Sequence, residues 1–179
     1  AFDLHCPLMS LPLAFGGIPG TVPYIKADPA PWAGRLPAGR RIGLAWSGNR
    51  RHRDDRNRSL PLSRFRQALV PGIDAVCLQK DIRPADRPWL AGEPGIRCFD
   101  AALDDFADTA ALIENLDLVV TVDTAVAHLA GALGKEVWIL LPYVPDWRWL
   151  LDRDDSPWYD SARLFRQPAL GDWDSVLRR

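Results

Sequence analysis

The sequence has little cysteine, and its cysteines do not form a recognisable site. Cys6, Cys77 and Cys98 are the only three among 179 residues, and they show no CxxC pair and no metal-ligand spacing. Scattered, odd-numbered thiols are typical of a reducing compartment, so we expect free cysteines and a cytoplasmic location. We expect no metal site, because His5 beside Cys6 supplies two ligands where a structural zinc site needs four.

Long hydrophobic runs and an excess of one charge are also missing. No segment approaches the roughly 18 apolar residues of a membrane-spanning helix, and the start of the chain has no basic leader of the signal-peptide kind. The 22 basic and 23 acidic residues give a formal net charge of -1. We therefore expect no transmembrane segment, and overall charge does not favour nucleic acid as a partner.

The most informative stretch runs from residue 116 to residue 141, LDLVVTVDTAVAHLAGALGKEVWILL. Residues 118–122 and 137–141 are short apolar runs typical of strands buried in a parallel sheet. Between them, Asp123-Thr124 can cap a helix over residues 125–133, with Gly134 at its end. The pattern predicts a βαβ unit, and its helix N-terminus is a potential anion site.

Polar side chains are expected at the carboxyl edge of the predicted sheet. His128 lies about one turn after Thr124, so Asp123, Thr124 and His128 are predicted to face one crevice. Ser47, Gly48 and Asn49 follow a strand predicted at residues 41–46, and Gln79-Lys80 follows one at residues 73–78. Three of these residues have a structural alternative: Asp123 as a helix cap, His128 as a half-buried core residue and Lys80 as a surface lysine.

A basic loop, RRHRDDRNRS, occupies residues 50–59. It can be a solvated charged loop, which is the usual role of such a run, or a nucleic-acid patch, which its lack of interleaved aromatic residues disfavours. Its position directly after a strand favours a third interpretation, in which an arginine such as Arg58 grips a phosphate. Neither a GxGxxG fingerprint nor a Walker loop is present.

Strands and helices alternate from residue 41 onward. Further strands are predicted at 95–99 and 163–167, and further helices at 60–69, from Asp108-Thr109 to 115, and from 171 onward. This alternation predicts an α/β fold with a Rossmann-like parallel sheet and helices on both faces. We expect three parts: residues 1–20 as the remnant of a preceding domain, 21–40 as a linker in which Trp32 is an anchor, and 41–179 as the Rossmann-like domain.

Several motifs in this order resemble one family. The pattern DTxxxHLAxALGK from Asp123 to Lys135 is similar to the donor-binding half of GT-B glycosyltransferases of the heptosyltransferase-like kind (family 9-like). The resemblance is stronger to bacterial proteins in which such a region follows tetratricopeptide repeats. The supporting segments are FDLHCPLMSLP (2–12), GLAWSGN (43–49), NRSLPL (57–62), LQK (78–80), DFADTAALI (105–113), DWRWLLDRDDSPWY (146–159) and LFRQP (164–168).

The resemblance implies the C-terminal half of a GT-B fold that holds a nucleoside-diphosphate sugar as donor substrate, without a further cofactor. The helix after Asp123-Thr124 would take the diphosphate, and Ser47 to Asn49 with Arg58 would close on it. Gln79 and Lys80 would contact the ribose or base, with Phe106 beside the base. His128 would assist by hydrogen bonding and is not assigned as the catalytic base.

The resemblance also limits what this chain is expected to do alone. In many inverting GT-B enzymes the catalytic base and the acceptor site belong to the N-terminal domain, so we expect a fragment that binds donor without turnover. No tetratricopeptide repeat is visible in the sequence, and the acceptor (a glycan, a lipid-linked sugar or a protein) is not indicated. Two alternatives stay open: a non-catalytic Rossmann-like scaffold module of a repeat protein, and a nucleotide-sugar epimerase.

Overall fold

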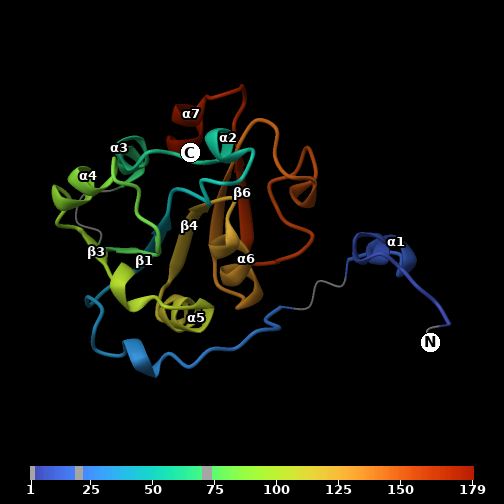
Figure 1. Cartoon of the computed structure of the whole chain (residues 1–179), viewed down its shortest axis with the longest axis horizontal. Helices are drawn as coiled ribbons and strands as arrows, with labels where there is room; N and C mark the ends of the chain where they lie inside the picture. The colour runs from blue at the N-terminus through green and yellow to red at the C-terminus, as the bar shows by residue number, and fades with distance from the viewer. Residues whose placement is uncertain (1–2, 19–21, 70–73) are drawn as a thin grey trace.

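The computed structural model describes residues 3–18, 22–69 and 74–179 (Figure 1). Within these residues, six strands form one all-parallel sheet in the order β3-β2-β1-β4-β5-β6. The strands are β1 (Ile42–Ala45), β2 (Ala75–Cys77), β3 (Ile96–Cys98), β4 (Leu118–Val122), β5 (Val137–Leu141) and β6 (Ala162–Arg166). The α/β, Rossmann-like prediction is confirmed.

Helices cover both faces of the sheet (Figure 1). The described α-helices are α1 (Leu11–Ala14), α2 (Asp55–Arg58), α3 (Leu62–Phe65), α4 (Arg87–Ala91), α5 (Phe106–Glu114), α6 (Ala125–Ala132) and α7 (Trp173–Leu177). Short 3-10 helices lie at Leu8–Ser10, Ala30–Trp32, Arg66–Ala68, Asp100–Ala102 and Trp147–Trp149. None of the described helices is long and apolar enough to cross a membrane.

The core consists of two buried clusters, one on each face of the sheet. Ala45 belongs to the cluster under α5 and α6, whereas Leu44 belongs to the cluster that includes residues of α3 and α7. Neighbouring strand residues point to opposite faces, so one apolar strand supplies both clusters. This is why the strands read as nearly unbroken apolar runs in the sequence.

The predicted βαβ unit is confirmed, and two helix predictions need correction. The helix predicted to begin at Asp108-Thr109 begins at Phe106, because Asp105 is the N-cap and Asp108 completes its capping box. The helix predicted over 60–69 is reduced to α3 and the one-turn 3-10 helix that follows. Ile73, the predicted start of β2, lies outside the described residues.

The segment between α1 and β1 packs along the base of the sheet domain from Val22 onward. The backbone N–H groups of Tyr24 and Ile25 both donate to the Ala132 carbonyl at the end of α6, at 3.0 and 3.2 Å. Trp32 is buried against α5, where its Nε1 donates to the Asp108 carbonyl at 3.2 Å. In contrast, α1 stands to the side of the sheet domain (Figure 1).

The Trp32 anchor makes a testable contribution to stability. Trp32→Phe should lower the free energy of unfolding by about 1–2 kcal/mol, because it removes one buried hydrogen bond and part of a large buried ring. Urea unfolding measures the change. Trp89→Phe is the matched control: Trp89 is 44% exposed, and its replacement should change stability by less than about 0.5 kcal/mol. Equal effects of the two substitutions would contradict the anchoring role.

Candidate functional site

The strand order places a crevice between the carboxyl ends of β1 and β4. β1 and β4 are neighbours in the sheet. Beyond β1 the sheet continues with β2 and β3, and beyond β4 it continues with β5 and β6, so the strand order reverses between β1 and β4. In open parallel sheets, ligands bind where the strand order reverses in this way. A cavity of about 1100 Å³ lies at this point, lined by the segments that follow β1, β2 and β4 and by the start of α5.

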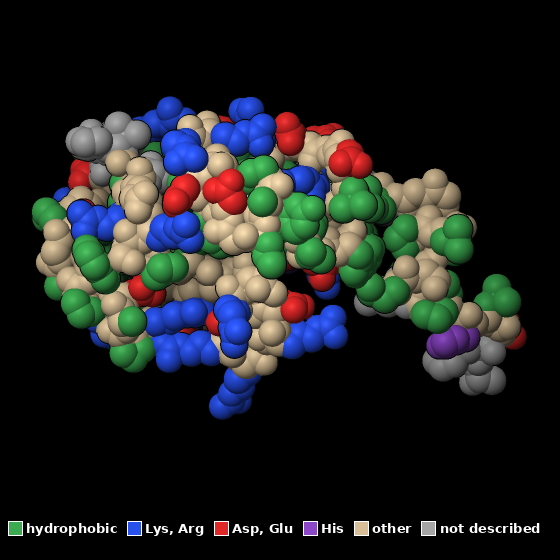
Figure 2. Space-filling model, turned by 90° about the horizontal axis from the view of Figure 1, so that it is seen from above, with side chains coloured by type: hydrophobic (Ala, Val, Ile, Leu, Met, Phe, Trp, Pro, Cys, Tyr) green, Lys and Arg blue, Asp and Glu red, His purple; other side chains and the backbone are tan. Residues whose placement is uncertain are grey.

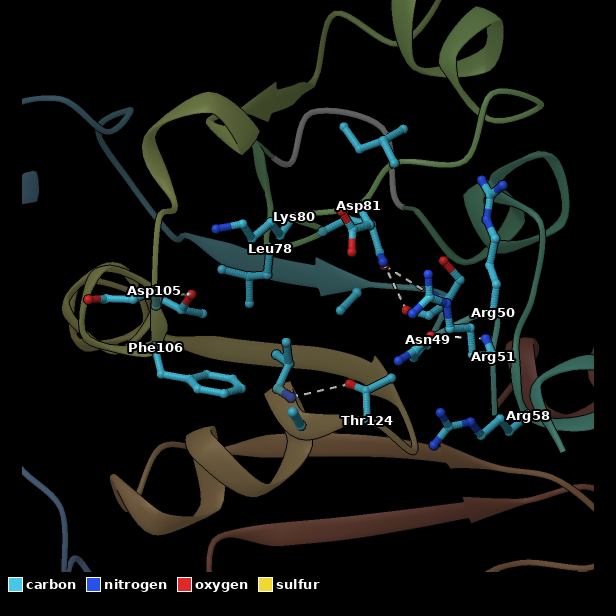
Figure 3. A pocket seen from close by; sticks show the side chains of 18 of the residues that line it. Asn49, Arg50, Arg51, Arg58, Leu78, Lys80, Asp81, Asp105, Phe106 and Thr124 are labelled. Carbon is cyan, nitrogen blue, oxygen red and sulfur yellow. Dashed lines mark hydrogen bonds between the residues drawn. The ribbon is translucent and has the colours of Figure 1, made fainter. Parts of the chain in front are cut away.

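Most of the predicted site residues line this first cavity. They are Ser47, Gly48, Asn49, Arg58, Gln79, Lys80, Phe106 and Thr124. Figure 3 shows Phe106 and Lys80 at one end of the cavity, Arg50, Arg51 and Arg58 at the other, and Thr124 between them. The cavity therefore has an end with an exposed aromatic ring and an end rich in arginine.

Asp123 and His128 do not face the first cavity. They line a second cavity of about 1280 Å³, together with Trp147, Trp158 and Tyr159. The prediction that Asp123, Thr124 and His128 face one crevice is confirmed, because all three line the second cavity. The expectation that they share this crevice with the residues after β1 and β2 needs correction: only Thr124 also borders the first cavity. The N-terminus of α6 separates the two spaces.

The second cavity lies between the sheet domain and the N-terminal arm, residues 3–18. Met9, Leu11 and Phe15 of the arm line it opposite Val144 and Trp147 of the sheet domain. Figure 2 shows hydrophobic side chains gathered on the side of the body nearest this arm. The tryptophan-rich segment after β5 thus forms a wall of the second cavity.

Arg58 lies at the junction of the two cavities and lines both. Its Nη1 donates to the Asp123 carbonyl oxygen at 2.9 Å, which ties the basic loop to the end of β4. A Cβ atom at Gly48 would lie 2.7 Å from Arg58 Nη2, so the absence of a side chain at Gly48 lets the guanidinium approach the loop after β1. Arg58 therefore contacts the segments that follow β1 and β4, the two strands between which the strand order reverses.

Two buried polar atoms on residues that line the first cavity have no partner among the described residues. They are Ser47 Oγ, on a residue that is 3% exposed, and Arg58 Nε. Buried polar groups are nearly always hydrogen-bonded, so each such atom needs an explanation, and one explanation is a bound ligand. Both residues line the first cavity.

Gln79 has a positioning role in the structure. Its Oε1 accepts hydrogen bonds from the backbone N–H groups of Trp46 and Ser47, both at 3.1 Å, and its Nε2 donates to the Ser47 carbonyl at 2.9 Å. The side chain is buried, and three of the four hydrogen bonds that its amide can make go to the end of β1. Direct contact of Gln79 with a ligand stays a prediction.

Asn49 and Lys80 also have partners within the protein. Asn49 Oδ1 accepts from the Arg51 backbone N–H at 2.9 Å, which shapes the turn after β1. Lys80 is exposed, and its Nζ donates to the Asp104 carbonyl oxygen at the rim of the first cavity. Phe106 is 63% exposed at the first position of α5. Its ring is therefore available to stack on a flat ligand.

A polar network that could not be predicted from the sequence supports the loop after β1. Arg83 Nη2 donates to both carboxylate oxygens of Asp55, at 2.8 and 2.7 Å, and to Ser59 Oγ at 3.1 Å. Ser59 Oγ in turn accepts from the Gly48 backbone N–H at 3.0 Å. This network holds Gly48 in place, and Arg83 lies 24 to 35 residues from its partners, too far for a local motif to reveal.

Thr124, and not Asp123, caps α6. Thr124 Oγ1 accepts from the Val126 backbone N–H at 3.3 Å. The Asp123 side chain, only 7% exposed, is left to face the second cavity. Burial lowers the pKa of nearby His128, and the Asp123 carboxylate partly opposes this effect. His128 is therefore neutral at pH 7. No group of three or more potential metal ligands occurs among the described residues.

The fold and the crevice define a Rossmann-like α/β domain with a cavity at its topological switch point. Residues 102–143 match the model of glycosyltransferase family 9 (heptosyltransferase). This segment includes α5, β4, α6 and β5 and supplies part of the lining of both cavities.

The chain is also similar to Protein FlbA from Caulobacter vibrioides. The two are 27% identical over 167 residues, which cover 87% of this chain and 28% of FlbA. The chain thus spans less than a third of the length of this curated relative. No solved structure matches the chain. These comparisons do not bear on the tetratricopeptide-repeat context, which stays a prediction.

Proposed function

We propose that this chain is the donor-binding domain of a GT-B glycosyltransferase. A nucleoside-diphosphate sugar would lie across the N-terminus of α6, with its base in the first cavity and its sugar in the second. The observation that carries this proposal is the junction between the cavities, where Arg58 lines both and has a buried Nε without a partner among the described residues. The family 9 match over residues 102–143 supports the same conclusion.

The chemistry of each part suits one part of such a donor. The N-terminus of α6 attracts a diphosphate through its dipole and first N–H groups, and Arg58 adds a charged donor. The exposed Phe106 ring offers a stacking surface for a base. When sugar transfer builds negative charge on the departing nucleotide, these donors would stabilise it.

The first test is a calorimetric titration of the purified chain with UDP, GDP, ADP and CMP. We expect saturable binding of one nucleotide, and for a diphosphate at least about tenfold weaker binding of the matching monophosphate, since a charge-assisted contact is lost. Asp123→Ala should weaken binding of the matching nucleotide sugar. Failure of the folded chain to bind any of these nucleotides would favour the scaffold alternative, and release of an epimerised nucleotide sugar would favour the epimerase.

A matched pair of variants then tests the two-cavity arrangement. Phe106→Ala removes an exposed ring from the first cavity, and Trp147→Ala removes a 47% exposed ring from the second. With UDP-glucose, ADP-glucose or GDP-mannose as the sugar conjugate, Phe106→Ala should weaken nucleotide and conjugate alike. Trp147→Ala should weaken only the conjugate. The reverse pattern would contradict the proposed orientation of the donor.

A further inference from the structure

Gly131 occupies an interior position of α6 because an aromatic ring packs directly on it. A Cβ atom at Gly131 would lie 2.4 Å from Tyr159 Cγ and 2.7 Å from both Cδ atoms. Glycine weakens a helix interior relative to alanine, so its presence here has a structural reason. The missing side chain lets the Tyr159 ring approach α6 more closely than any other residue at position 131 would permit.

The packing of Tyr159 on Gly131 brings the Tyr159 hydroxyl to His128. Residues three apart lie on one face of a helix, so His128 is next to Gly131 and within reach of the same ring. The Tyr159 hydroxyl lies 3.0 Å from His128 Nδ1. On the other side, the buried Trp149 ring stacks on the imidazole, with centroids 5.1 Å apart and planes inclined by 14°. The imidazole is thus held by one aromatic ring and one hydroxyl.

The His128 imidazole and the Tyr159 phenol are both neutral near pH 7, and this determines which of them donates the hydrogen bond. Burial lowers the pKa of His128; the charges of Asp123 and Asp146 oppose that shift, and Arg148 adds to it. Burial raises the pKa of the Tyr159 hydroxyl far above its ordinary value, and a side-chain hydrogen bond with Tyr24 raises it further. A neutral phenol is a stronger donor than an imidazole N–H and a neutral imidazole nitrogen is a good acceptor, so O–H···N is the favoured arrangement at the 3.0 Å contact, in competition with Tyr24 for the same proton.

We propose that Tyr159 is a positioning residue that donates to His128 Nδ1 and makes the imidazole present Nε2–H to the second cavity. A hydrogen bond at one ring nitrogen sets the proton on the other, as in the outer contacts of metal-bound histidines. This inference rests on the proposed function in one respect: the acceptor of Nε2–H is then an oxygen of the bound sugar. In this arrangement His128 donates a hydrogen bond to the ligand and does not accept a proton from it.

The test is the tautomer of His128 in the ¹⁵N-labelled chain, read from two-bond ¹H–¹⁵N correlations without ligand. We expect one tautomer with Nδ1 unprotonated, whereas the exposed His5 should show both. Tyr159→Phe keeps the ring on Gly131 but removes the hydroxyl, so His128 should become a mixture of tautomers in a folded protein. A protonated Nδ1 in the parent chain, or an unchanged tautomer in Tyr159→Phe, would overturn the proposal.

Binding provides the second measurement. Tyr159→Phe should weaken binding of the nucleotide sugar by roughly tenfold and leave the free nucleotide unaffected, since one hydrogen-bond donor is no longer fixed. Gly131→Ala, which displaces the Tyr159 ring, should reproduce the tautomer change. Because the tautomer is measured without ligand, the two proposals can fail separately. Failure of the chain to bind any nucleotide overturns the proposed function. Equal affinities of the parent chain and Tyr159→Phe for the nucleotide sugar overturn the role of Nε2–H in binding.

Discussion

Replacing Asp86 by alanine is expected to lower the free energy of unfolding by about 3–5 kcal/mol. Asp86 is 2% exposed, and each of its carboxylate oxygens accepts one buried hydrogen bond. Oδ2 accepts from Trp46 Nε1 and Oδ1 from the Leu62 backbone N–H, both at 2.9 Å. The alanine variant would leave both donors buried without a partner, and each unpaired donor costs about 1–3 kcal/mol.

The effect of Asp86 should extend to the candidate site. Trp46 directly precedes Ser47, and Leu62 begins α3, so the carboxylate joins the end of β1 to the first helix after the basic loop. Urea unfolding followed by tryptophan fluorescence measures the loss, with an unchanged m-value as the sign that stability alone has changed. The Asn variant keeps one acceptor oxygen and should fall between alanine and the parent chain.

Asp160→Ala is the matched control for Asp86→Ala, because the Asp160 side chain is exposed. It should leave the unfolding midpoint unchanged within experimental error. If Asp86→Ala were no more destabilising than Asp160→Ala, the carboxylate would not organise the end of β1.

The βαβ unit around α6 could be predicted from sequence because all of its signals are local. Two apolar runs, a capping residue and a helix-ending glycine lie within 26 residues, and β4 and β5 have the predicted bounds. The start of α5 was harder. Asp105 and Asp108 are both plausible caps, and the capping box uses them together, with Asp105 as the N-cap.

The candidate site could be predicted only in outline, because its geometry depends on contacts between distant segments. The sequence placed Gln79 at the correct edge, but its engagement with Ser47 depends on the register between β1 and β2. The contacts of Arg83 with Asp55 and of Asp86 with Trp46 span 28 and 40 residues. Such pairs share no local pattern, so tertiary packing alone reveals them.

The division of the site into two cavities has the same origin. Helical spacing correctly put His128 near Thr124, but it did not reveal what packs on that side of α6. The Tyr159 and Trp149 rings come from the segment between β5 and β6 and enclose His128 in the second cavity. The role of Gly131 was likewise hidden, because its partner ring is 28 residues away in the sequence.

The largest effect on binding is expected from Arg58→Ala. If the proposed function is correct, this variant should bind the nucleoside diphosphate about 10–100-fold more weakly, which corresponds to one charge-assisted hydrogen bond in a partly buried position. The guanidinium is held by the Asp123 carbonyl and by its contact with Gly48, so it is preorganised at the junction of the cavities. Little side-chain entropy would then be lost when a phosphate binds.

Arg56→Ala is the matched control for Arg58→Ala, since Arg56 is an exposed residue on the same four-residue helix, α2. Both variants remove one positive charge from the basic loop, so a long-range electrostatic effect would weaken binding equally in both and would decrease with salt. A direct contact predicts a large loss only in Arg58→Ala. Arg58→Lys should recover part of the affinity, because a lysine keeps the charge but not the planar, two-pronged donor. Equal losses in the alanine variants of Arg56 and Arg58 would mean that the arginine-rich end of the cavity attracts the ligand without a specific contact at the junction.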